Sequence, residues 1–154
     1  MNGVVRVAGE SMSPTYRSFD LLLTRPAQGP DAPRRDDVVV LRHDGTRMVK
    51  RLVGVPGDLV ELDAGRLFVN GESVHGAPRV RGAHVQVWRV PPGTYFVTGD
   101  NPLLSDDSRV WDEPFVPVAS IEAVVTRRLA GCWPSADRAR KIWSSALGCP
   151  TGRG

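Results

Sequence analysis

The chain has 154 residues and a formal net charge of +3, with 41% hydrophobic and 24% charged residues. These values are typical of one soluble globular domain and exclude a collagen-like or wholly disordered chain. The longest aliphatic run covers residues 38–41, whereas a membrane-spanning helix needs about 20 apolar residues. No secretory signal follows Met1. The basic residues form no block typical of a large nucleic-acid footprint, so we expect no nucleic-acid partner.

Short β-like segments separated by turn signals make up most of the chain. In chain order, the predicted strands are residues 4–8, 21–24, 37–42, 47–53, 59–62, 67–70, 85–90, 95–98 and 121–129. Turns are expected at 43–45, 56–58, 63–65 and 70–71, which are rich in Gly, Pro, Asp and Asn. This pattern predicts a mainly β fold, a single domain of coiled antiparallel β-sheets.

One stretch near the C-terminus has helical periodicity. Residues 135–147 place apolar side chains near one face, with Ser135 as a candidate N-cap and Gly148 as a stop signal. We therefore assign residues 1–130 to the β domain and residues 131–154 to a C-terminal tail with a short helix.

The cysteines Cys132 and Cys149 and the three histidines have no metal-like spacing. We therefore expect neither a metal nor another cofactor. A Cys132–Cys149 disulfide, in an oxidising compartment, and two free thiols both stay open.

Lysine is scarce in this chain. Of the 20 cationic residues 18 are arginine, and only Lys50 and Lys141 are lysine. Unlike a guanidinium group, an amine can lose its proton at accessible pH, so a retained lysine indicates a chemical role. In the predicted strand 47–53, Lys50 shares a face with Met48 and Leu52. Desolvation between them disfavours the ammonium and would make Lys50 a general base. The alternative is an amphipathic strand whose lysine reaches water.

A serine that follows the first predicted strand is a candidate nucleophile. Ser11 lies in a loop opened by Gly9 and pinned by Pro14. Because a serine hydroxyl is a weak nucleophile at neutral pH, Ser11 would need a base. The alternative is an ordinary turn with polar residues.

The polar loop 99–109 directly follows the predicted strand 95–98. It offers Ser105 as a hydrogen-bond partner that would orient a neutral amine. Asp107 and Arg109 are two residues apart, so an ion pair between them could brace the loop. An ordinary cluster of turns is the alternative.

The order and content of these blocks resemble the type I signal peptidases, the Ser–Lys serine proteases that cut leader peptides from precursors. The resemblance covers residues 7–125, about four fifths of the chain. The matching blocks are Ser11-Met12-Ser13-Pro14-Thr15, Asp37-Val38-Val39-Val40-Leu41, Val49-Lys50-Arg51-Leu52-Val53-Gly54-Val55-Pro56-Gly57-Asp58, and Gly99-Asp100-Asn101 with Ser105-Asp106-Asp107-Ser108-Arg109.

The resemblance implies a serine endopeptidase that works through an acyl-enzyme. By position, Ser11 would be the nucleophile and Lys50 the general base. Ser105 would hold the Lys50 amine, and Asp107 and Arg109 would support the loop. The backbone N–H of Ser11 would donate to the oxyanion that develops in the transition state.

The resemblance also implies the kind of partner. The substrate would be a precursor protein with small residues at positions −1 and −3 before the cleavage site. Its extended leader would pair with a strand edge near Arg47, Met48 and Val49, with Met12 also in contact.

Four departures from the family pattern stand out. Gly9 occupies a position where some members carry a hydroxyl, and Asp112 replaces a glycine that often closes the last block. Only ten residues precede Ser11, so the usual transmembrane anchor is missing from the sequence as it stands. The segment between the lysine block and the last block is short, which predicts a minimal catalytic core.

Two settings stay open for such an enzyme. It is either a soluble cytoplasmic maturation protease dedicated to one precursor, or a membrane-associated signal peptidase with an extracytoplasmic active site whose anchor lies outside this chain. A catalytically degenerate protein that binds leader peptides is the non-enzyme alternative, favoured by Gly9 and Asp112 and disfavoured by Ser11 and Lys50. A self-cleaving repressor is disfavoured, because ten residues before Ser11 hold neither a DNA-binding segment nor a cleavage site.

Overall fold

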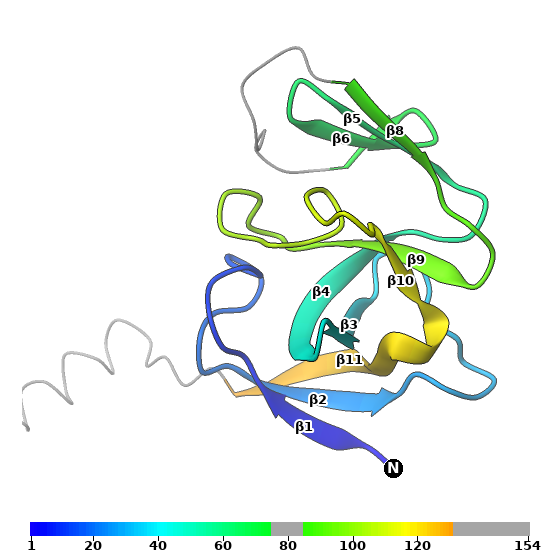
Figure 1. Ribbon diagram of the computed structural model, residues 1–154. Helices are drawn as coiled ribbons and strands as arrows, with labels where there is room; N and C mark the ends of the chain where they lie inside the picture. The colour runs from blue at the N-terminus through cyan, green and yellow to red at the C-terminus, as the bar shows by residue number, and fades with distance from the viewer. Residues whose placement is uncertain (75–84, 131–154) are drawn as a thin grey trace, which may run out of the picture.

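A computed structural model describes residues 1–74 and 85–130 (Figure 1). These residues form eleven β-strands and one 3-10 helix, η1. The elements are β1 (Gly3–Arg6), β2 (Leu21–Pro26), β3 (Val38–His43), β4 (Thr46–Gly54), β5 (Leu59–Asp63), β6 (Arg66–Val69), β7 (Glu72–Ser73), β8 (Val85–Arg89), β9 (Thr94–Thr98), β10 (Phe115–Pro117), η1 (Val118–Ser120) and β11 (Ile121–Ala130).

The predicted mainly β fold is confirmed. The nine predicted strands correspond to β1–β6, β8, β9 and β11, with ends shifted by up to two residues. The strands β7 and β10 were not predicted, because two and three residues are too few for a visible alternation. The predicted helix 135–147, both cysteines and the tail 131–154 lie outside the described residues.

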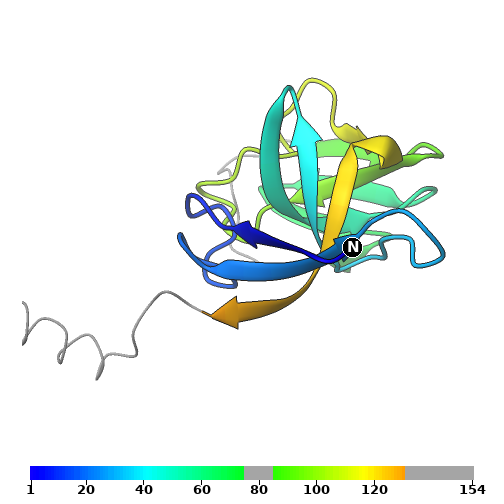
Figure 2. The same ribbon diagram turned by 90° about the horizontal axis from the view of Figure 1, so that it is seen from below.

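The strands form two antiparallel sheets. The larger has seven strands in the order β1-β2-β11-β3-β4-β9-β10, and the smaller has four in the order β7-β6-β5-β8. In Figure 1 the smaller sheet lies at the top, at the opposite end from the N-terminus. Figure 2 shows that the larger sheet is strongly coiled, with the β3–β4 hairpin turned steeply against β1 and β2. The prediction of coiled antiparallel sheets is therefore confirmed.

Two hydrophobic clusters form the core, and β4 and β9 contribute to both. The first contains Ala27, Val39, Leu41, Leu52, Tyr95, Val97, Val116, Ile121 and Val124. The second contains Val53, Val60, Leu62, Leu67, Val69, Val90 and Phe96. Because side chains alternate along a strand, neighbouring residues of β4 and of β9 enter different clusters. These two strands thereby connect the sheets.

The contact between β4 and β9 depends on a glycine. The pairing of these strands has an irregularity between Leu52 and Gly54. A Cβ on Gly54 would lie 2.9 Å from the Cβ of Phe96, which is closer than packed carbon atoms come. Glycine is therefore required for the close approach that joins the two clusters.

Among the residues that the structure describes, no helix has the length and apolar character needed to cross a membrane.

Candidate active site

The β3–β4 hairpin positions Lys50. The turn residues Asp44 and Gly45 have φ angles of 45° and 77°, which suits the right-handed twist of a two-residue hairpin. The predicted alternation along β4 holds, because Met48 and Leu52 both pack with the first cluster. Lys50 lies between them and is only 4% exposed. Its side chain is therefore buried, and the alternative in which it reaches water is wrong.

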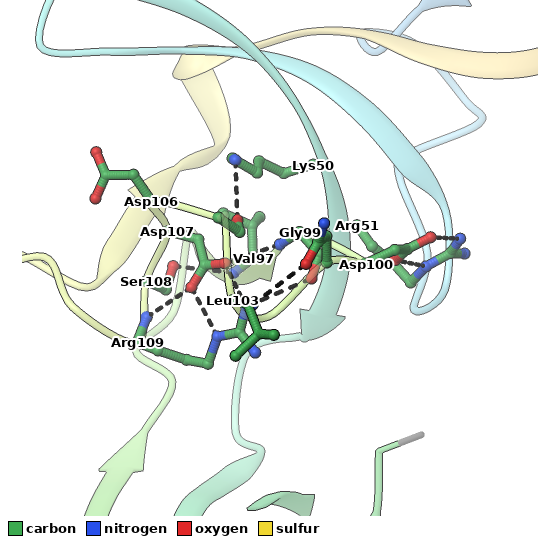
Figure 3. A network of polar contacts seen from close by, with 12 residues as sticks. Lys50, Arg51, Val97, Gly99, Asp100, Leu103, Asp106, Asp107, Ser108 and Arg109 are labelled. Atoms are coloured by element: carbon green, nitrogen blue, oxygen red, sulfur yellow. Dashed lines mark hydrogen bonds and ion pairs between the residues drawn. The ribbon is translucent and has the colours of Figure 1, made fainter. Parts of the chain in front are cut away.

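The Lys50 amine contacts the loop that follows β9. Nζ of Lys50 donates a hydrogen bond of 3.1 Å to Oγ of Ser105, the residue predicted to orient it (Figure 3). Ser105 is itself 1% exposed. The pairing of a strand lysine with a loop serine 55 residues away is thus present and sheltered from solvent.

Asp107 is the centre of that loop. Its carboxylate accepts hydrogen bonds from the backbone N–H of Gly99 at 2.9 Å and from Nε and Nη2 of Arg109 at 2.8 and 2.6 Å (Figure 3). The side chains of Asp107 and Arg109 are 0% and 7% exposed. The predicted brace between these two residues is therefore a buried ion pair that also fixes the start of the loop.

Two opposing influences act on the pKa of Asp107. Burial raises this pKa, but the hydrogen bonds and positive charge of Arg109 lower it, with further help from Ser105 and the Gly99 N–H. The net result is a pKa below the ordinary value for an aspartate. Asp107 is therefore an ionised carboxylate whose charge is balanced within the loop.

The loop that carries Ser11 docks on the loop after β9. The backbone N–H of Asn101 donates to the carbonyl oxygen of Ser11 at 2.9 Å, and Oγ1 of Thr15 donates to Asp100 at 2.6 Å. Gly99 lies between Ser11 and Ser105, since a Cβ on it would collide with both the Ser11 carbonyl oxygen and the Ser105 hydroxyl. Ser11, Ser105 and Lys50 thus belong to one connected group of residues.

The departure at Gly9 has a conformational explanation. Gly9 has a φ of 81°, in the left-handed region that side chains other than glycine rarely adopt. The turn that delivers Ser11 therefore requires glycine at this position, and the glycine is not by itself a sign of lost function.

The predicted substrate contacts differ in accessibility. Met12 is 1% exposed, so its side chain packs inside the protein and cannot face a bound peptide. Arg47 is exposed, but its Nε donates to Glu122 at 2.7 Å. Met48 and Val49 are half-buried.

The backbone of β4 is nevertheless open along part of its length. β4 pairs with β3 from residue 46 to 51, whereas its pairs with β9 begin only at Arg51. Among the described strands, residues 46–49 therefore form no strand pair on the β9 side. This edge ends just before Lys50 and is open to pairing with an extended peptide.

One ion pair of the site, between Arg51 and Asp100, was not predicted from the sequence. Arg51 binds Asp100 in a two-pronged ion pair, Nε to Oδ1 and Nη2 to Oδ2, both at 2.7 Å (Figure 3). The hydrogen bonding of Arg51 to the Asp100 carboxylate, against the effect of burial, raises the pKa of Arg51. Both residues lie in the recognised blocks, but spacing alone does not reveal a pair 49 residues apart. This pair ties β4 to the loop that receives Ser11.

A cavity of about 440 Å³ lies between the Ser11 loop, which contributes Pro14 and Thr15, and the smaller sheet. Arg51, Gly99, Asp100 and Arg109 line it together with the β5–β6 turn, whereas Ser11, Lys50 and Ser105 do not. The buried amine and its serine partner are therefore separate from this cavity. Among the described His, Cys, Asp and Glu side chains, no group of three or more is arranged to hold a metal ion.

The close approach at Gly99 makes a testable prediction. Gly99→Ala should lower the free energy of unfolding by about 1–3 kcal/mol, because overpacking forces neighbours to shift. Urea denaturation would measure the loss. Gly3→Ala is the control, since its Cβ would meet only a side-chain oxygen of Thr24 at 3.1 Å on an edge strand. Equal stability of the two variants would contradict the packing described for Gly99.

Comparison with known proteins assigns a family to this arrangement. The fold and the site define a class of β proteins in which a loop serine holds a buried lysine of a strand. The family model described as "Signal peptidase, peptidase S26" matches residues 2–130. The chain therefore belongs to the signal peptidase S26 family, as the sequence blocks predicted.

Several curated relatives and a solved structure agree. Signal peptidase I of Pseudomonas fluorescens is 32% identical over 149 residues, covering 73% of this chain and 50% of that protein. Signal peptidase I of Bacillus caldolyticus is 34% identical over 147 residues, covering 83% of this chain and 78% of the relative. The crystal structure of a signal peptidase I from Enterococcus faecalis V583 has a TM-score of 0.50 and 33% identity, covering 61% of this chain and 97% of that one. The chain spans about half the length of its two Pseudomonas relatives.

Proposed function

We propose that this protein is a serine endopeptidase that removes a leader or signal peptide from a precursor protein. Ser11 is the nucleophile and Lys50 the general base. The observation that carries the proposal is the buried Lys50 amine, hydrogen-bonded at 3.1 Å to Ser105 on the loop that docks against Ser11. Membership of the signal peptidase family supports the reaction class.

The burial of Lys50 supports its role as a base. At 4% exposure the amine is removed from water, and desolvation disfavours the ammonium form. An uncharged amine can accept the proton of a serine hydroxyl, which a guanidinium group cannot do.

The chemistry proceeds through an ester of Ser11. Lys50 takes the proton from the Ser11 hydroxyl as Oγ attacks the scissile carbonyl, and the Ser11 N–H donates to the resulting oxyanion. The protonated amine then gives its proton to the leaving amino group, and the peptide bond breaks. In the second half, Lys50 takes a proton from water, which attacks the ester and releases the leader with its new carboxylate. Ser11 regains its proton from Lys50.

Ser105 and Asp107 orient the base. Ser105 accepts a hydrogen bond from Nζ of Lys50, and its hydroxyl also interacts with the Asp107 carboxylate. The hydrogen bond to Ser105 therefore fixes the direction in which the Lys50 amine points. Asp107 stays fixed by Arg109 at 2.6 and 2.8 Å. The two residues therefore act through Lys50 and not on the substrate.

The substrate is an extended segment of a precursor with small residues at positions −1 and −3. The open edge of β4 at residues 46–49 supports this, because an extended peptide adds to such an edge by main-chain hydrogen bonds. A folded segment could not form those bonds, so the preferred partner is an unfolded leader.

A cleavage assay tests the proposal. Wild type should cut a precursor with an Ala-x-Ala leader in detergent-free buffer, and Ser11→Ala should lower the rate by about 10³-fold or more, since the acyl-enzyme cannot form. Ser73→Ala, which alters an exposed serine of β7, is the matched control and should cut normally. Absence of cutting by wild type across such precursors would favour the alternative of a leader-binding protein. Cutting by Ser11→Ala would remove Ser11 as the nucleophile.

A further inference from the structure

The polar loop that carries Ser105 is attached to β4 through Lys50 and Arg51, and the segment that follows it contacts the tip of the β3–β4 hairpin. We propose that His43 and Trp111 are positioning residues, whose stacked rings hold this loop over the hairpin and keep Ser105 against Lys50. This inference rests on the proposed function, because it assigns the pair a role in orienting the base.

The contact between the two rings is close and nearly parallel. The ring centroids of His43 and Trp111 are 3.8 Å apart, with 15° between the ring planes. His43 is the last residue of β3, opposite Thr46 at the start of β4. Stacked aromatic rings attract each other beyond the area that they bury. The pair therefore joins the tip of the hairpin to the segment after Arg109.

Trp111 is bound to the Ser105 loop on its other side. Its indole Nε1 donates to Asp106 at 3.1 Å, and its backbone N–H donates to the carbonyl oxygen of Asp107 at 3.2 Å. Asp106 and Asp107 directly follow Ser105. A displacement of the indole would therefore pull on the residues that hold the serine.

The strand register puts both attachments on one face of the hairpin. Lys50 lies opposite Val39, and Thr46 lies opposite His43. Since residues of β3 two and four positions apart share a face, His43 is on the same face as Lys50 and Met48. Met48 and Trp111 both pack against the first hydrophobic cluster. The indole thus packs on the same face of the hairpin as Lys50.

The stack of His43 and Trp111 helps to explain how the exposed loop 99–109 keeps Ser105 in contact with Lys50. The loop also carries Leu103 and Leu104, which are 69% and 66% exposed, so apolar packing of its tip does not hold it down. The hydrogen bond between Lys50 and Ser105 by itself stabilises this position of the loop only modestly. The stack supplies a further attachment at the tip of the hairpin, in addition to the Arg51–Asp100 ion pair.

The test uses the two lysines of the chain. Lysine labelled with 13C at Cε gives one signal each for Lys50 and Lys141, and Lys141→Arg assigns them. In Trp111→Ala and His43→Ala, we expect the Lys50 signal to titrate at higher pH than in wild type, because water admitted beside the amine stabilises its charged form. The nearby negative charge of Asp107 also affects the pKa of Lys50. Neither variant changes that charge, and Arg109 balances it at 2.6 Å.

Kinetics provide a second readout. Both variants should lower kcat about tenfold with KM within about twofold, because orientation of the base is disturbed while the substrate edge is kept. His43→Phe, which keeps a flat ring for stacking, should restore most of kcat. Trp88→Ala is the matched control: it removes a half-buried tryptophan that contacts Phe96 in the other cluster, and it should leave the Lys50 titration unchanged.

The outcomes separate this inference from the proposed function. An unchanged Lys50 titration in both His43→Ala and Trp111→Ala would overturn the positioning role, even if the wild type cuts. If Trp111→Ala does not fold, His43→Ala decides, because its ring lies at the end of a hairpin. If the variants shift the Lys50 titration but the wild-type protein cuts no precursor, the positioning role of His43 and Trp111 is supported and the proposed protease function is contradicted.

Discussion

Replacing Lys50 by methionine should lower precursor cleavage by about 10³-fold, within the range that loss of a general base costs, while the protein stays folded. Methionine has nearly the length of lysine and suits a position between Met48 and Leu52. The change removes the hydrogen bond to Ser105, for which the expected cost in stability is only about 1 kcal/mol. A cleavage assay and a thermal melt on the same preparation would separate the two effects.

Two further variants make this prediction specific. Lys50→Arg keeps a positive charge but cannot give up its proton near neutral pH, so it should be inactive as well. Arg89→Met removes a cation from the exposed side of β8 and should cut at the wild-type rate. Near-normal turnover by Lys50→Met would show that another group deprotonates Ser11.

Asp107→Asn should destabilise the protein by about 3–5 kcal/mol, the usual cost of removing one partner of a buried ion pair. Arg109 is 7% exposed and would be left without its counter-charge. The asparagine amide would also face N–H donors that now point at the carboxylate, including the backbone of Gly99. Urea denaturation at pH 7 would measure the loss. Asp106→Asn is the matched control, because an amide oxygen can still accept from the Trp111 indole.

The pH dependence of the same pair has a definite sign. The folded protein holds the pKa of Asp107 below its ordinary value, so folding favours the ionised carboxylate. The resulting stabilisation is complete above the unfolded pKa of about 3.9, and it is lost as the pH falls through the lower folded value. Wild type should therefore lose more stability than Asp107→Asn between about pH 5 and the acid limit. Parallel stability curves would contradict this account.

Local patterns were sufficient to predict much of the fold and part of the site. The alternation along β4 placed Lys50 between Met48 and Leu52, because the two-residue period of a strand is a local property. The pair Asp107–Arg109 was also predictable, since its members are two residues apart. The short strand β10 escaped notice because Phe115–Pro117 has no room for a period.

The long-range contacts could not be predicted from spacing. Arg51 meets Asp100 across 49 residues, and His43 meets Trp111 only because β3 ends beside the loop after β9. The burial of Met12 was missed for a similar reason, since whether a loop residue faces inward depends on what packs over it. Likewise, the sequence does not show that Glu122 binds Arg47 at 2.7 Å.

The smaller sheet occupies a particular place in the chain. It runs from β5 to β8, between β4 and β9, yet those two strands pair directly, with Gly54 opposite Phe96. Both connections to the smaller sheet therefore start from adjacent positions in the larger sheet, where β4 and β9 are paired. Lengthening or trimming a segment whose ends are already held together changes the closure entropy only slightly. The smaller sheet can therefore change in length with little effect on the pairing of β4 and β9. A recognition hairpin grafted into it should leave the contact between Lys50 and Ser105 in place.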